Sequence, residues 1–102
     1  MNMNYSAVIE PNVESVPQHP DDAAVDRFAA AMKEKLAQAR AKGRGGWDNP
    51  AQCSVETLAR MLVEHVAKGD PRDIANFAMM LYERGADPQV LAQASMNFSS
   101  SY

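Results

Sequence analysis

Apolar residues recur at every third or fourth position along much of this chain, the spacing that places them on one side of an α-helix. The first such pattern covers residues 21–42 and predicts a long helix. Acidic residues open this segment and basic residues close it, which complements the helix dipole. Gly43 follows, at a position where helices commonly end. Its predicted apolar stripe consists of Val25, Phe28, Ala29, Met32, Leu36 and Ala39.

Three shorter helices are predicted after a glycine-rich loop at residues 43–52. Ser54 is a good N-cap for a helix over residues 55–68. The next helix covers residues 71–84 and begins with Asp70 as N-cap and a proline at the first helical position. Its expected inward residues are Ile74, Phe77, Ala78 and Leu81. An Asp-Pro pair repeats this start for a short helix over residues 88–94.

These elements define an all-α fold, a small helical bundle built on a hairpin of the two middle helices. Residues 1–20 contain three prolines and predict an extended or flexible N-terminal arm. Residues 21–94 form the helical domain, and the serine-rich residues 95–102 are expected to be a flexible tail. Apolar residues lie on more than one face of the helix at 71–84, so we expect a homo-oligomer.

Length, composition and charge limit the cellular location and the partners that we expect for this protein. With 102 residues, the chain is near the lower size limit for a self-sufficient core. It has no run of eighteen apolar residues, no signal-peptide pattern and one cysteine, so we expect a cytoplasmic protein that does not span a membrane. A net charge of −3 argues against binding to duplex nucleic acid, although basic residues cluster near the end of the first helix.

Three segments within residues 28–85 resemble the MazG-like family of all-α NTP pyrophosphatases, including its phage-borne members. They are residues 28–47, 54–64 and 73–81, and the last reads Asp-Ile-Ala-Asn-Phe-Ala-Met-Met-Leu. In that family an EExxE motif and an ExxD motif bind Mg²⁺ around a nucleoside triphosphate. The resemblance implies Glu64 and Asp73 as catalytic residues, and Glu64, Asp70 and Asp73 as metal ligands.

This chain departs from the family pattern at several positions. His65 and Lys68 stand where the family has glutamates, and only nine positions separate Glu64 from Asp73. Three carboxylates are few for a site that must hold two metal ions and orient a water molecule. We therefore expect a phage-type protein that holds or sequesters a phosphate-bearing nucleotide, such as a defence signalling nucleotide, with little turnover and no cofactor. The candidate ligand-binding residues are Lys68, Arg72, Asn76, Trp47 and Arg44.

Two other functions remain open at this point. One is a working Mg²⁺-dependent nucleotide pyrophosphohydrolase. The other is a helical protein-interaction module without a small ligand, which gains support if Trp47 is packed into the core. Each candidate residue also has a structural interpretation: Asp70 and Asp73 cap a helix, and Asn76 forms a buried hydrogen bond, for which we expect the loop around Trp47 as partner.

Overall fold

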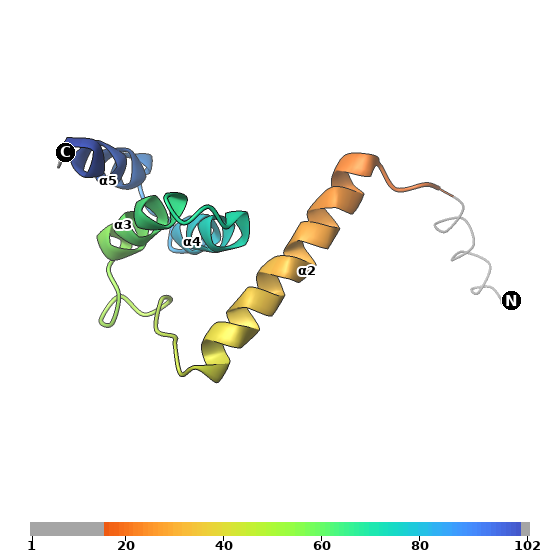
Figure 1. The fold of residues 1–102 in the computed structure, drawn as a ribbon, viewed down its shortest axis with the longest axis horizontal. Helices are drawn as coiled ribbons and strands as arrows, with labels where there is room; N and C mark the ends of the chain where they lie inside the picture. The colour runs from red at the N-terminus through yellow and green to blue at the C-terminus, as the bar shows by residue number, and fades with distance from the viewer. Residues whose placement is uncertain (1–15, 101–102) are drawn as a thin grey trace, which may run out of the picture.

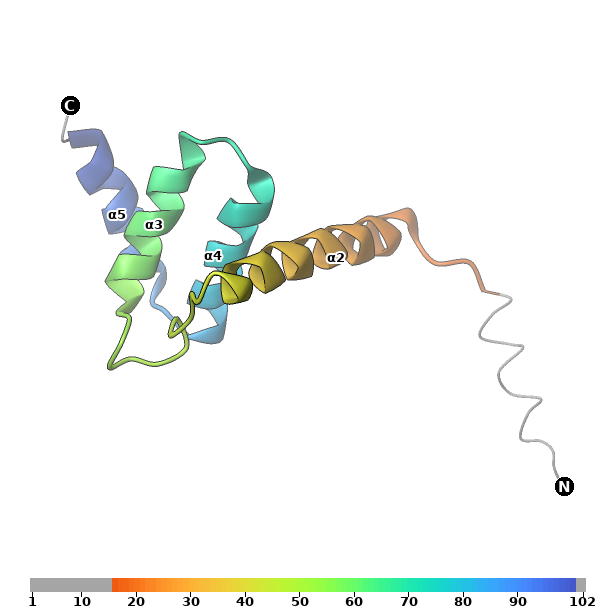
Figure 2. The same ribbon diagram turned by 60° about the horizontal axis from the view of Figure 1, so that its bottom comes forward.

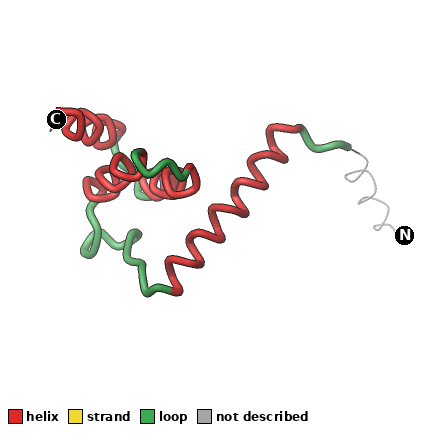
Figure 3. The backbone as a smooth tube through the Cα atoms, viewed as in Figure 1, coloured by secondary structure: helices red, strands yellow, loops and turns green. Residues whose placement is uncertain are grey.

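The computed structural model describes the backbone of residues 16–100 and the side chains of residues 16–98. Within this part the chain forms four helices, which are α2 (Pro20–Ala41), α3 (Val55–Val66), α4 (Pro71–Glu83) and α5 (Pro88–Ser100), as Figure 1 shows. Figure 3 shows no strand among the described residues. The all-α prediction is confirmed for this part. The predicted arm at residues 1–20 lies largely outside the described residues.

Local hydrogen bonds explain where the helices begin. The Ser54 hydroxyl accepts a hydrogen bond from the Thr57 backbone N–H, and Asp70 accepts one from Arg72. Both N-caps are therefore confirmed. The first helix is capped instead by His19, whose ring Nδ1 accepts from the Asp21 backbone N–H at 3.0 Å. Histidine is not among the usual capping residues, so this cap was not predicted.

The last helix is longer than the sequence indicated. The prediction of a helix ending near residue 94, followed by a flexible tail from residue 95, is wrong, because α5 continues to Ser100. Partly buried residues recur at four-residue intervals at Val90, Ala94 and Phe98, so the helical spacing extends through the serine-rich segment. A hydrogen bond of 2.9 Å from Gln93 Nε2 to Asn97 Oδ1 spans one turn of this extension.

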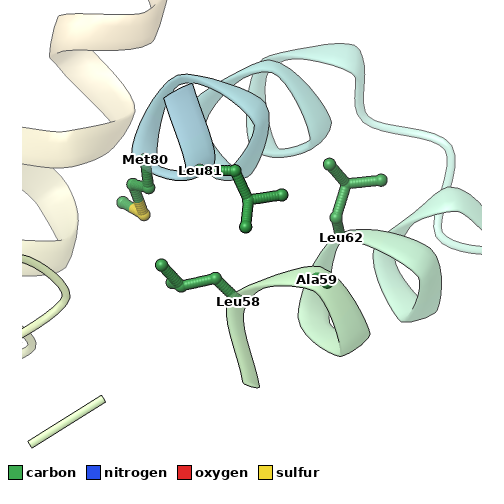
Figure 4. Packing of buried hydrophobic residues seen from close by; sticks show 5 residues of the cluster. All are labelled: Leu58, Ala59, Leu62, Met80 and Leu81. Atoms are coloured by element: carbon green, nitrogen blue, oxygen red, sulfur yellow. The ribbon is translucent and has the colours of Figure 1, made fainter. Parts of the chain in front are cut away.

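The core is small and lies between α3 and α4. Its five buried apolar residues are Leu58, Ala59, Leu62, Met80 and Leu81 (Figure 4). Residues Val90, Leu91 and Ala94 of α5 pack against this cluster while remaining partly exposed. On α4, Met80 is buried and Ala78 is exposed, so the buried face is turned from the one expected from the sequence. No helix in residues 16–100 is long and apolar enough to cross a bilayer.

The long first helix is largely exposed and packs on only one other helix. It packs against α4 and not against α3 or α5, and it has no buried residue. Figures 1 and 2 both show its first half projecting away from the other helices. Val25 is 64% exposed and Phe28 is 39% exposed. The predicted apolar stripe is therefore covered only in the second half of α2.

The position of Leu58 at the centre of the core leads to a stability prediction. Leu58→Ala should lower the free energy of unfolding by about 2–5 kcal/mol, because it removes buried methyl groups and leaves a cavity. Urea unfolding followed by circular dichroism measures the change. Met96→Ala is the matched control, since Met96 is exposed and its loss should change stability by less than about 0.5 kcal/mol. Equal effects of the two changes would contradict this core assignment.

Candidate functional site

Several predicted site residues gather where α2 meets the first turns of α4. At this contact Lys35 of α2 lies between the two aspartates of α4. Its Nζ is 3.3 Å from Asp73 Oδ1 and 3.7 Å from Asp70 Oδ2. All three side chains are about three-quarters buried, so this ion pair is shielded from solvent more than most surface pairs. A cation supplied by the protein therefore occupies the position between the carboxylates.

Arg72 adds a second cation to this cluster by clamping Asp70. Its Nε donates to Asp70 Oδ1 at 3.1 Å and its Nη2 donates to Asp70 Oδ2 at 2.8 Å. The Arg72 backbone N–H also donates to Oδ1, at 2.9 Å. These side-chain and backbone hydrogen bonds, with a further contribution from the charge of Lys35, hold the pKa of Asp70 well below its usual range. Arg72, predicted to bind phosphate, thus has a carboxylate partner within its own helix.

Asn76 lies one turn beyond Asp73 and is 5% exposed. Its Nδ2 donates to the Met32 backbone oxygen of α2 at 3.2 Å. The expected partner, the loop around Trp47, is therefore wrong: the hydrogen bond goes to α2. Asn76 Oδ1 is buried without a hydrogen-bond partner in the described part of the chain. A buried acceptor of this kind is costly, so Asn76 has one side-chain atom whose hydrogen-bonding capacity the fold does not use.

Glu64 lies apart from this cluster, on the side of α3 that faces α5. Its carboxylate is 3.6 Å from the guanidinium of Arg60, and the side chain borders a cavity between α3 and α5. No group of three His, Cys, Asp or Glu side chains within the described residues is arranged to hold a metal ion. The structure does not bring together Glu64, Asp70 and Asp73, and the residues present do not fit a magnesium centre.

The glycine-rich loop is fixed by a residue that the sequence analysis did not select. Arg84 Nη1, at the end of α4, donates to the backbone oxygen of Trp47 at 2.6 Å and to that of Cys53 at 2.9 Å. Trp47 itself is partly buried and packs against the core. This matches the structural interpretation of Trp47. Arg44 and Lys68 are exposed, and the structure shows neither in contact with the Asp70 cluster.

A cavity of about 630 Å³ lies between α3 and α5. Four of its lining residues are apolar: Val63, Val90, Ala94 and Phe98. Glu56, Arg60 and Glu64 border it from α3, while Gln89, Gln93 and Asn97 border it from α5. We call this cavity the α3–α5 groove. Most of its residues lie beyond position 88, in the segment where the sequence predicted a short helix and a tail, so the sequence analysis missed it.

Comparison with family models, with curated proteins and with solved structures finds no match to this chain. The resemblance to MazG-like pyrophosphatases therefore stays a prediction.

The role of Asp70 in the polar cluster can be tested through the pH dependence of the free energy of unfolding. Its lowered pKa means that the folded chain binds the proton less readily than the unfolded chain does. The stabilisation is therefore complete above the ordinary aspartate pKa of 3.8 and is lost as pH falls below that value. Asp70→Asn should be less stable than the parent at neutral pH, and this difference should shrink as pH falls below 3.8.

The measurement is urea unfolding of both proteins over that pH series. Asp87→Asn is the matched control, because Asp87 Oδ1 also accepts a backbone N–H, from Gln89 at 2.8 Å, at the start of α5. Within residues 16–98 the structure shows no ion pair for Asp87, so its substitution should give a smaller pH-dependent difference. A stability difference for Asp70→Asn that does not change with pH would contradict the assigned role of Arg72.

Proposed function

We propose that this protein is a helical protein-interaction module, and that the α3–α5 groove binds an amphipathic helix of a partner protein. The observation that carries the proposal is the groove itself, an apolar floor between two helices with polar residues along both edges. An amphipathic helix binds in such a groove by placing apolar residues at helical spacing on the floor. A second support is that Arg72, Asp70 and Asp73, all expected at the nucleotide or metal site, are already paired with one another or with Lys35.

The shape and chemistry of the floor agree with this type of ligand. Val63 comes from α3, while Val90, Ala94 and Phe98 come from successive turns of α5. Ala94 lies between two larger side chains, so the floor has a low point bounded by Val90 and Phe98. A leucine or phenylalanine of the bound helix would fill that position and bury apolar surface on both sides.

The edge formed by α3 indicates the charge of the partner. It has two glutamates and one arginine, and Arg60 already pairs with Glu64. The remaining charge on this edge is negative, while the edge formed by α5 has uncharged amides. A partner helix with lysine or arginine beside its apolar face therefore has the better electrostatic match.

A model peptide tests this proposal directly. The probe is a helical peptide with leucines at positions i, i+3, i+4 and i+7, flanked by lysines. We expect it to bind the parent protein and to perturb the NMR signals of the four floor residues. Val63→Glu should weaken binding at least about tenfold, because it places a charge on the apolar floor. Attraction by charge alone would instead strengthen binding of the basic peptide to this variant.

Val66→Glu is the matched control for that experiment. It makes the same substitution on the same helix, at a residue that is 55% exposed and does not border the groove. Binding to this variant should equal or slightly exceed binding to the parent. If both variants bind equally well, or if the peptide perturbs signals outside the groove, the proposed surface is wrong.

A second candidate function is the holding of a phosphate-bearing nucleotide without turnover. The specific observation in its favour is the buried Asn76 Oδ1, which has no hydrogen-bond partner among the described residues. It lies one helical turn after Arg72 and after Asp73, the partner of Lys35. Asn76 Oδ1 is an acceptor and would take a hydrogen bond from a base or sugar of the nucleotide. The phosphate would have to compete with Asp70 and Asp73 for Lys35 and Arg72. That competition makes phosphate binding unfavourable, so this function is ranked second.

Calorimetric titration with a panel of nucleotides, together with a pyrophosphate-release assay with Mg²⁺, separates these functions. The interaction module predicts neither binding nor release. Nucleotide binding that is weakened about tenfold or more by Asn76→Leu, without pyrophosphate release, would favour the second candidate. Rapid release abolished by Glu64→Ala or Asp73→Ala would favour a pyrophosphohydrolase and contradict both proposals.

A further inference from the structure

The apolar stripe of α2 continues beyond the part of the helix that α4 covers. In the second half, Met32, Lys35 and Leu36 meet α4 or the core. In the first half, Val25 and Phe28 are exposed at the same helical face, and Figure 2 shows this half standing clear of the other helices. An isolated helical segment without a packing partner is only marginally stable in water. The uncovered half-stripe therefore needs a partner surface of similar length.

A row of charged residues runs beside this stripe and indicates what the partner is. Asp22, Asp26, Lys33 and Arg40 are separated by four, seven and seven positions, which are close to whole numbers of helical turns, so they share one side of α2. All four are exposed, and Asp26 also accepts a hydrogen bond from Gln18 at 2.7 Å. Along the helix the row has two acids followed by two bases.

This order is self-complementary when two such helices lie antiparallel. In a parallel pair the two rows would lie on opposite sides of the contact, so neither row would meet its copy. In an antiparallel pair with its two-fold axis between residues 27 and 28, Asp22 of each copy lies opposite Lys33 of the other. The same axis places Phe28 of both copies at the centre, with Val25 nearby. The same surface patch on each copy thus contacts that patch on the other copy, as a two-fold symmetric interface requires.

We propose that two copies of this chain associate through residues 22–33 of their α2 helices, in antiparallel orientation. The exposed stripe supplies the apolar contact, and the charge row sets the direction. The contact involves about three turns of each helix, which places it among small interfaces of the size seen in transient associations. The α3–α5 groove takes no part in this contact, so the inference is independent of the proposed function and is tested separately.

Sedimentation velocity over a dilution series tests the association. The full-length protein should dissociate from dimer to monomer on dilution, and Phe28→Asp should be monomeric throughout. Met96→Asp is the matched control, because Met96 is an exposed apolar residue on α5 and its substitution should leave the dimer unchanged. A full-length protein that is monomeric at every concentration, or a dimer retained in Phe28→Asp, would overturn the proposal.

Charge exchange tests the orientation. Asp22→Lys and Lys33→Asp should each raise the dissociation constant about tenfold, since each places like charges opposite one another. The double variant restores opposite charges and should return to within about threefold of the parent value. Circular dichroism confirms that each variant keeps its helix content. Single changes without effect, or a double variant no tighter than the single ones, would overturn the antiparallel arrangement.

Discussion

The placement of the first helix depends on Lys35 and its two aspartate partners on α4. The 22-residue α2 has no buried side chain, so little apolar burial holds it in place. Lys35 reaches Asp70 and Asp73 at once, and one turn away Asn76 donates to the Met32 backbone oxygen. Exposed ion pairs contribute little individually, but partly buried, connected pairs contribute more and fix one geometry. These polar contacts therefore determine where α2 lies relative to the core.

Because Asp70 and Asp73 help to hold α2 in place through these contacts, the polar cluster is limited in what it can do chemically. A carboxylate that holds a lysine or an arginine in the folded chain would have to release it before binding a metal ion. At Asp70 that release would break two side-chain hydrogen bonds and leave Arg72 without its partner. The structural use of these residues thus opposes the catalytic use implied by the family resemblance. It moves the proposed function to the α3–α5 groove.

The sequence was informative at several positions where the structure is determined by neighbouring residues. Ser54 and Asp70 were recognised as caps because capping involves side chains two or three residues apart, and the boundaries of α3 and α4 followed. It was uninformative about contacts between distant segments. Neither Lys35 nor Arg84 has a local signature, since their partners lie more than thirty positions away. Composition also misled the prediction at residues 95–100, where serines suggested a tail although the helical spacing of apolar residues continued.

Arg84 affects the order in which segments of the folded chain open locally. By donating to two backbone oxygens of one loop, it joins the end of α4 to residues 47 and 53 on either side of a turn. Opening this loop requires that the guanidinium release both oxygens. The glycine-rich loop and the last turn of α4 should therefore open together, as one cooperative unit, and later than the projecting half of α2. Glycine content alone would have predicted the opposite order.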